Sequence, residues 1–142
     1  MTIQDITVAY TAVATAENGR DGRVSSDDGN LDVIVNPPKA MGGSGAGTNP
    51  EQLFAAGYSA CFQGALGVVA RQEKADITGS TVTAEVSIGK TAEGGFGLEA
   101  AISATIPNVD TATAQSLVEK AHQVCPYSNA TRGNIKVELS VA

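Results

Sequence analysis

The chain contains few of the residue types on which several common chemistries depend. Among its 142 residues there is no tryptophan, aromatic residues make up 4%, and there are two cysteines and one histidine. Lysine and arginine together number nine, against 15 acidic residues, which gives a formal net charge of −6. Because binding to a nucleic-acid backbone requires clustered basic side chains, this composition predicts no nucleic-acid partner.

The supply of metal-binding side chains is equally small. His122, Cys61 and Cys125 are the only imidazole and thiol groups, and they have neither CxxC nor HxxxH spacing. We therefore predict no metal site. A cysteine hydrolase would need His122 as its general base, one turn before Cys125. We interpret His122 instead as an exposed helix residue.

No secretion or membrane signal stands out in the sequence. The first eighteen residues lack a basic segment followed by an apolar run, so we expect a cytoplasmic protein. Residues 53–70 carry no charge and reach the lower length limit of a membrane span. Tyr58, Ser59 and Gln63 interrupt this run, which favours a buried helix and no membrane association. In a reducing compartment two cysteines form a transient disulfide more readily than a lasting one.

The length and the hydrophobic pattern predict a single domain over residues 1–142. The pattern predicts strands over residues 6–15, 23–27, 31–35, 81–90, 96–106 and 135–141, and helices over residues 50–74 and 111–124. Helices inserted among antiparallel strands are typical of an α+β fold. We expect an antiparallel sheet and a long, buried central helix.

The long helix has a well-marked start. Asn49 is a suitable N-cap, Pro50 suits the first helical position, and Gln52 could reach back to the cap as in a capping box. Only the ends of the helix are charged, so we expect its middle to be buried all round.

One side of the long helix carries only small residues. Ala56, Ala60 and Gly64 recur at every fourth position. This spacing leaves room for another backbone to approach the helix closely.

Cys61 lies in the middle of this apolar helix. Free cysteine is often buried as a small hydrophobic residue, and burial raises the pKa of a thiol and makes it inert. The helix dipole acts only within the first turn, whereas Cys61 is ten residues beyond Glu51. A reactive Cys61 therefore requires a cation from elsewhere in the chain.

Cys125 ends a helix directly before Pro126, which disfavours helical backbone at the preceding residue. At such a helix end its side chain can be exposed or mobile. Three readings remain open for this cysteine: a small residue at a helix end, a structural disulfide with Cys61, or a redox-active pair with Cys61. A reducing compartment favours the redox-active pair.

Three segments resemble a known family. Residues 48–62 (TNPEQLFAAGYSACF) and 124–134 (VCPYSNATRGN) are similar to the two signature blocks of the organic hydroperoxide resistance proteins, within the OsmC-like superfamily. Residues 18–22 (NGRDG) resemble the arginine-bearing turn of that family, although Asn18 stands where a glycine is common. The resemblance covers essentially the whole chain and implies an OsmC-like fold.

The resemblance also implies roles for four residues. Cys61 matches the peroxidatic cysteine, whose thiolate attacks the peroxide bond and becomes a sulfenic acid. Cys125 matches the resolving cysteine, which forms an intrachain disulfide with it. Arg20 matches the arginine that stabilises the thiolate and orients the peroxide, and Glu51 matches the carboxylate that positions this arginine. The RDG context assigns this role to Arg20 rather than to the nearby Arg23.

The family further implies a lipoyl-dependent peroxidase that reduces organic and fatty-acid hydroperoxides to alcohols under oxidative stress. Dihydrolipoamide or a lipoylated protein would be the external reductant, without a bound cofactor. An intertwined homodimer with its sites at the subunit interface is also implied. The apolar residues around Cys61 agree with such substrates, and we predict that four of them contact the substrate: Leu53, Phe54, Phe62 and Leu66.

Helix geometry adds a hypothesis about the dimer. Glu51 and Cys61 are ten residues apart, hence about 15 Å along one helix, so Glu51 does not reach Cys61 of its own helix. We therefore expect a partner subunit to supply Glu51, together with Arg20. Two alternatives to a peroxidase remain: a redox-sensing or lipid-binding protein that uses the cysteine pair as a switch, and a structural dimer with inert thiols.

Overall fold

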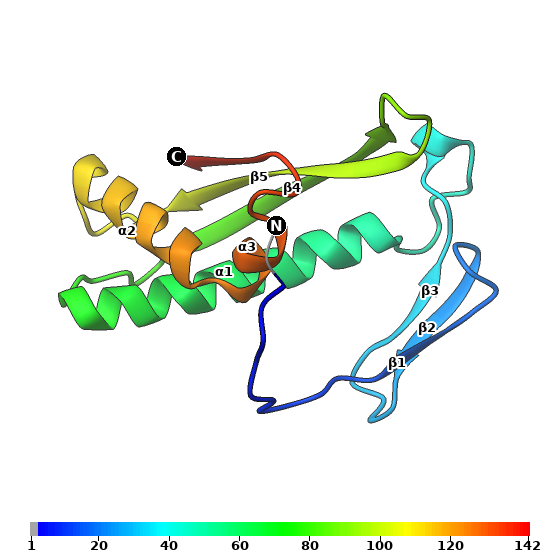
Figure 1. The fold of residues 1–142 in the computed structure, drawn as a ribbon, viewed down its shortest axis with the longest axis horizontal. Helices are drawn as coiled ribbons and strands as arrows, with labels where there is room; N and C mark the ends of the chain where they lie inside the picture. The colour runs from blue at the N-terminus through cyan, green and yellow to red at the C-terminus, as the bar shows by residue number, and fades with distance from the viewer. Residues whose placement is uncertain (1–2) are drawn as a thin grey trace. The chain divides into compact units, whose positions relative to one another are not determined.

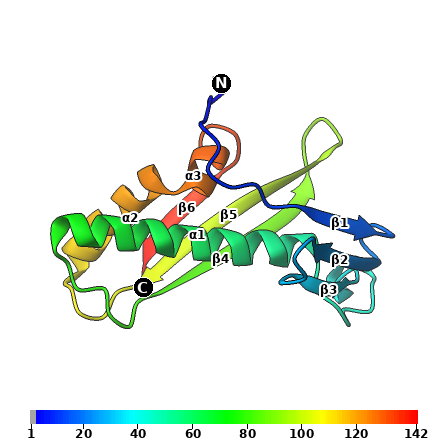
Figure 2. The same cartoon turned by 90° about the horizontal axis from the view of Figure 1, so that it is seen from below.

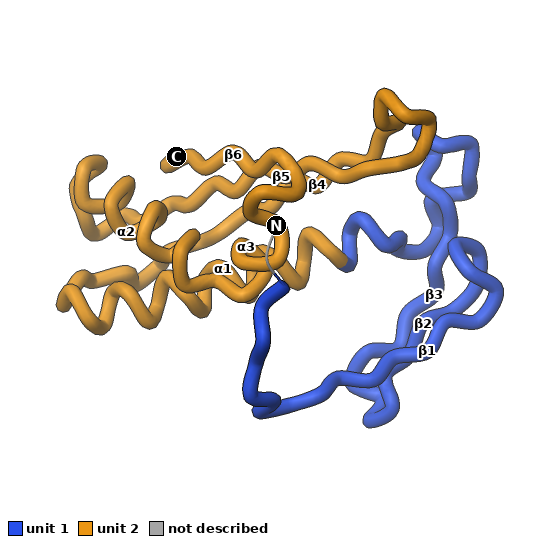
Figure 3. Tube along the Cα trace, in the orientation of Figure 1, with its two compact units in different colours: residues 1–53 blue, residues 54–142 orange. Residues whose placement is uncertain are grey.

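The computed structural model describes residues 3–142, and the chain divides into two compact units that meet between Leu53 and Phe54 (Figure 3). The elements run in the order β1 (Ala14–Glu17), β2 (Gly22–Ser26), β3 (Asp32–Val35), the 3-10 helix η1 (Lys39–Met41), α1 (Pro50–Glu73), β4 (Thr81–Lys90), β5 (Phe96–Thr105), α2 (Thr111–Val124), α3 (Pro126–Thr131) and β6 (Val137–Val141) (Figure 1). The expected α+β class is confirmed. A single domain over residues 1–142 stays a prediction.

The N-terminal unit contains a three-stranded antiparallel sheet in the order β1-β2-β3. The turn between β1 and β2 uses left-handed backbone at Asn18 (φ 61°) and Gly19 (φ 59°), conformations that asparagine and glycine tolerate best. This turn sets the pairing of Glu17 with Arg23 and leaves Arg20 at its tip.

The strand predicted over residues 6–15 is wrong for most of its length, because β1 begins only at Ala14. Ile6, Val8 and Tyr10 are 77%, 65% and 80% exposed. The apolar alternation is present, but within residues 3–142 no strand pairs with this segment. A strand without a neighbour leaves its backbone hydrogen-bonding groups to water, so the pattern alone does not make a strand here.

The start of α1 is capped as expected, with one difference. Asn49 Oδ1 accepts a 2.8 Å hydrogen bond from the backbone N–H of Gln52. The Gln52 side chain, however, accepts a 2.7 Å bond from the Thr48 hydroxyl instead of reaching the backbone of Asn49. Thr48 is held in place by its bridge to Val35, which presents its hydroxyl to the first turn of the helix.

The C-terminal unit has a sheet in the order β4-β5-β6. Strands β4 and β5 pair antiparallel over their full length, as expected, whereas β6 runs parallel to β5, which makes this sheet mixed. The reason is the connection between β5 and β6. The crossover through α2 and α3 returns the chain to the end of the sheet at which β5 began, and such a crossover joins parallel strands.

Helices α1 and α2 pack against one face of this sheet (Figure 2). Their buried side chains form a single core with those of β5, whose largest fully buried members are Tyr58, Phe62, Leu66, Ile102, Leu117 and Val118. On α2 four residues are buried: Ala114, Leu117, Val118 and Ala121. Asp110 caps this helix, accepting a 2.7 Å hydrogen bond from the Thr113 N–H.

Helix α1 is long and apolar enough to cross a membrane by length and composition, and about a third of its most apolar stretch is buried. The expectation that its middle is buried all round is wrong within this chain. Ala56, Ala60 and Gly64 are exposed, whereas Tyr58, Phe62 and other large residues face the core. Helix α1 therefore packs as a core helix with one open, small-residue side.

Candidate functional site

The C-terminal unit brings the two cysteines together. Cys61 lies in α1 and Cys125 at the junction of α2 and α3, and their sulfur atoms are 3.5 Å apart as free thiols. Cys61 is partly exposed, whereas Cys125 is fully buried. Since a disulfide bond measures about 2.05 Å, closing the pair requires a further approach of about 1.5 Å. This pairing is the first requirement of a redox-active site.

Cys125 is buried, although a helix end would allow its side chain to be exposed. Pro126 ends α2, but it also occupies the first position of α3, and Cys125 becomes the N-cap of that helix. Its sulfur lies 3.5 Å from the backbone nitrogen of Ser128, which donates to it. Its side chain therefore belongs to the core of the unit.

The surroundings of Cys61 act on its thiol in opposite directions. Burial has the largest effect and raises the pKa of Cys61 above its ordinary value. The backbone N–H of Tyr127 lowers this pKa, while the neighbouring Cys125 raises it further. The net direction is upward, so Cys61 needs additional positive charge to become a thiolate near neutral pH, as its position in the sequence predicts.

Tyr127 is a member of this site that sequence reasoning missed. Its ring packs against Phe54 and Tyr58, with centroids 6.0 and 5.6 Å apart. The ring lies over Gly57, where a Cβ atom would be 2.5 Å from the tyrosine hydroxyl oxygen. Glycine inside a helix costs about 1 kcal/mol relative to alanine, so Gly57 in mid-helix was the available signal for a closely packed neighbour.

A chain of polar side chains lies behind the buried sulfur. His122 Nδ1 is 2.8 Å from Ser128 Oγ, which is 2.8 Å from the Tyr58 hydroxyl, which is 3.1 Å from Thr131 Oγ1. The interpretation of His122 as a simply exposed residue is therefore wrong, because it is half-buried and hydrogen-bonded. Burial, with a smaller effect of the Arg132 charge, lowers the pKa of His122.

The N-terminal unit pairs the two predicted charged residues. The Arg20 guanidinium donates two hydrogen bonds to the Glu51 carboxylate, of 3.1 Å to Oε2 and 2.9 Å to Oε1. The hydrogen bonds from Arg20 hold the pKa of Glu51 below its ordinary value, although burial opposes them. Arg23 pairs instead with Asp32 on β3. The contact supports choosing Arg20 over Arg23, while the action of this pair on Cys61 stays a prediction.

The four predicted substrate contacts differ in exposure. Phe62 and Leu66 are fully buried in the core, so neither presents a surface to a ligand in this conformation. Leu53 and Phe54 are half-buried. Phe54 also packs edge-on against Tyr58, with ring centroids 6.1 Å apart. Contact between these residues and a substrate stays a prediction.

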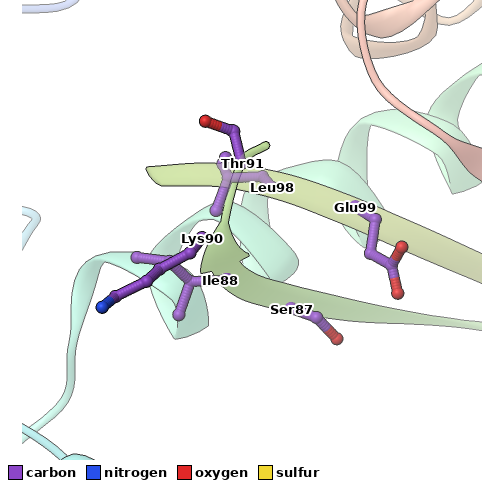
Figure 4. Close-up of a pocket in the computed structure, with 8 residues that line it drawn as sticks. Ser87, Ile88, Lys90, Thr91, Leu98 and Glu99 are labelled. Atoms are coloured by element: carbon purple, nitrogen blue, oxygen red, sulfur yellow. The ribbon is translucent and has the colours of Figure 1, made fainter. Parts of the chain in front are cut away.

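A separate hollow of about 360 Å³ lies near the turn end of the β4–β5 hairpin (Figure 4). It is lined by Ser87, Ile88, Gly89, Lys90, Thr91, Gly97, Leu98 and Glu99, and neither cysteine is among them. Over residues 3–142 no group of three histidine, cysteine or acidic side chains is arranged to hold a metal ion. The cysteine pair is therefore the best candidate for chemistry.

The Arg20–Glu51 pair predicts a pH-dependent stability difference between the protein and its Glu51→Gln variant. A carboxyl whose pKa is lowered by folding stabilises the folded state above its unfolded pKa, and this stabilisation is lost as the pH falls through the folded pKa. We expect a difference in the free energy of unfolding of up to about 1 kcal/mol at pH 7 that disappears as the pH falls through the lowered pKa of Glu51. Urea unfolding across this range measures it. In an Arg20→Gln background the difference should shrink, and a difference independent of pH contradicts the assignment.

The contact between Gly57 and Tyr127 predicts the effect of adding a methyl group. Gly57→Ala should be less stable than Gly67→Ala by about 1–3 kcal/mol, because the first overpacks the tyrosine ring. Gly67 is the matched control on the same helix, since a Cβ there meets only the end of the Arg71 side chain at 3.6 Å. Thermal and urea unfolding of both variants test this, and equal stabilities would show that the ring is not held against the helix.

Comparison with known proteins places this chain in a family. The family model of OsmC-like proteins matches residues 42–140. An organic hydroperoxide resistance protein of Xanthomonas axonopodis pv. citri is 53% identical over 137 residues, which cover 95% of this chain and 96% of that protein.

Solved structures agree with the sequence comparison. The structure of an organic hydroperoxide resistance protein from Elizabethkingia anophelis is 54% identical, with a TM-score of 0.91 and coverage of 96% of this chain and 99% of that one. The OhrB protein of Bacillus subtilis is 46% identical, with a TM-score of 0.86 and coverage of 94% and 98%. The expected OsmC-like fold is thus confirmed, and the chain belongs to the OsmC-like proteins and, among them, to the organic hydroperoxide resistance family.

Proposed function

We propose that this protein is a thiol peroxidase that reduces organic hydroperoxides, fatty-acid hydroperoxides included, to alcohols. The observation that carries the proposal is the pair of free thiols 3.5 Å apart, one partly exposed and one buried. Its relatives are named for resistance to organic hydroperoxides. A role in the response to oxidative stress and a cytoplasmic location, where thiols stay reduced, belong to the same proposal.

The first step uses the partly exposed sulfur. The Cys61 thiolate attacks one oxygen of the peroxide, so that an S–O bond forms and the O–O bond breaks. The departing alkoxide takes a proton and leaves as the alcohol, while Cys61 becomes a sulfenic acid. The partial exposure of Cys61 supports its choice as the residue that meets the peroxide.

The second step uses the buried sulfur. The Cys125 thiolate attacks the sulfenic sulfur of Cys61, an S–S bond forms, and the hydroxyl group leaves as water after protonation. The short distance between the two sulfur atoms supports this step, because side-chain adjustment of about 1.5 Å is sufficient.

An external dithiol completes the cycle without a bound cofactor. We propose a dihydrolipoyl group, free or carried by a protein, which supplies two electrons and two protons and becomes the cyclic disulfide. Its thiolate would attack Cys61, because Cys125 is fully buried. Cys125 then leaves as the thiolate, and the second thiol of the reductant releases Cys61.

Arg20 supplies the positive charge in this proposal. Burial raises the pKa of Cys61, and a guanidinium close to the sulfur would favour the thiolate again. Glu51 holds the Arg20 side chain with two hydrogen bonds, which fixes the direction of its remaining donors. The same donors would orient the peroxide oxygen.

We propose that the working form is an intertwined homodimer in which a partner subunit supplies Arg20 and Glu51. Two surfaces support a partner: the exposed apolar residues Ile6, Val8 and Tyr10, and the open small-residue side of α1. Ten residues of helix separate Glu51 from Cys61, about 15 Å, which favours supply from a second chain over supply along the same helix.

The cysteine pair also fits a second function, a redox sensor or a binder of lipid-like ligands that uses the disulfide as a switch. The same 3.5 Å contact supports it. Sustained turnover distinguishes the two, because a switch forms its disulfide once and consumes little peroxide.

The peroxidase proposal predicts the behaviour of the Cys61→Ser variant. Purified protein with dihydrolipoamide should consume cumene hydroperoxide over many turnovers, and the serine variant should lose essentially all of this activity, because serine cannot form the sulfenic acid. Cys125→Ser should retain one turnover, since only the second step is blocked. Peroxide consumption followed with time measures all three proteins. Equal activity of Cys61→Ser and the unmodified protein would falsify the proposal.

Sharing of residues between subunits predicts complementation. A heterodimer of one Cys61→Ser chain and one Glu51→Ala chain contains one complete site if the partner supplies Glu51, so it should recover roughly half of the unmodified dimer's activity. The two homodimers should be nearly inactive. Heterodimers isolated through two different tags provide the measurement, and their inactivity would show that each chain uses its own Glu51.

A further inference from the structure

The polar side chains behind Cys125 form a chain of hydrogen bonds whose direction is fixed by counting protons. Thr131 donates its hydroxyl proton to the backbone carbonyl of Ser128, at 3.3 Å. Its oxygen must therefore accept in its contact with Tyr58. Because the Tyr58 proton is used there, the Tyr58 oxygen accepts from the Ser128 hydroxyl.

This order leaves one arrangement for His122. With its own proton directed to Tyr58, the Ser128 hydroxyl can only accept in its 2.8 Å contact with His122 Nδ1. All four contacts are satisfied together only when Nδ1 carries a proton. Both the neutral Nδ1–H tautomer and the doubly protonated ring meet this condition, so the directions of the hydrogen bonds are the same in both charge states.

The chain ends on the residue that contacts the buried sulfur. Ser128 is fully buried at the third position of α3, and its backbone N–H donates to Cys125. The adjacent backbone N–H, that of Tyr127, acts on Cys61. Fixing the Ser128 side chain therefore fixes the backbone N–H that donates to the Cys125 sulfur.

His122 is itself held from the other side. Arg132, which follows α3, donates a 2.5 Å hydrogen bond to the His122 carbonyl, and a 2.9 Å bond to the Asn129 side chain holds its guanidinium. These bonds join the last turn of α2 to the C-terminal end of α3. A network of several hydrogen bonds restrains the His122 side chain more than a single contact does.

We propose that His122, as an Nδ1–H donor, is a positioning residue for the resolving thiol: it fixes Ser128 and thereby keeps Cys125 against Cys61. His122 touches neither sulfur in the contacts described here and acts through Ser128. The proposal deepens the proposed peroxidase function, since it concerns the closing of the disulfide. Closing can also be driven by an oxidant other than a peroxide, so the two proposals can be tested separately.

The tautomer gives a spectroscopic test. His122 is the only histidine in the chain, so its two ring nitrogens can be assigned without ambiguity in a ¹⁵N NMR spectrum. At pH 8, where the lowered pKa keeps the ring neutral, we expect the proton on Nδ1. A proton on Nε2 instead of Nδ1 at this pH would overturn the proposed directions of the hydrogen bonds.

The kinetic test uses diamide, which forms an adduct with the Cys61 thiolate that Cys125 then displaces. His122→Leu removes the donor and should slow closure of the disulfide about tenfold, the effect of losing one buried hydrogen bond. His122→Asn keeps an N–H donor near the same place and should remain within about threefold of the unmodified protein. As a control, the rate at which iodoacetamide alkylates Cys61 in a Cys125→Ser background should be the same with His122 and with His122→Leu.

Tyr58→Phe provides an independent variant if His122→Leu does not fold. This variant keeps the aromatic ring but removes the hydroxyl at the centre of the hydrogen-bond network. Closure of the disulfide should again slow several-fold. Equal closure rates in His122→Leu or Tyr58→Phe and the unmodified protein would overturn the proposal, as would equal slowing in His122→Leu and His122→Asn. Failure to consume cumene hydroperoxide, with the closure defects intact, would instead reject only the peroxidase.

Discussion

The contact between the Cys61 and Cys125 sulfur atoms depends on one local event, the start of a new helix directly after α2 ends. Pro126 stops α2 and begins α3, which makes Cys125 an N-cap with its sulfur turned inward toward the Ser128 N–H. The same turn sets the Tyr127 ring against Gly57 and places Ser128 within reach of Tyr58. The junction of α2 and α3 is therefore what places the Cys125 sulfur beside that of Cys61.

Burial of the cysteine pair has two consequences for its chemistry. It keeps Cys125 from water and raises the pKa of Cys61, which works against the thiolate that the proposed chemistry needs. Backbone donors at α3 reverse only part of this effect. In the function proposed above, the Arg20–Glu51 pair of the N-terminal unit supplies the positive charge that Cys61 needs.

Local chemistry explains what the sequence predicted well. The bounds of β4 and α2, the cap at Asn49 and the turn at Asn18 follow from neighbouring residues. The direction of β6 and the absence of a strand over residues 6–13 depend on which segments lie side by side, and periodicity carries no such information. The partners of His122 and the burial of Cys125 likewise arise from contacts between helices, whereas the three family-like segments singled out the cysteines and Arg20 directly.

The separation of the two sulfur atoms also determines how much of the protein takes part in a redox change. A displacement of about 1.5 Å is within the range of side-chain motion, which takes picoseconds to nanoseconds and leaves the backbone hydrogen bonds of α1 and α2 intact. Proteins whose cysteines must unfold a segment to meet expose apolar surface in every cycle. Here the distance between the sulfur atoms is short enough for the pair to close without such an opening of the core.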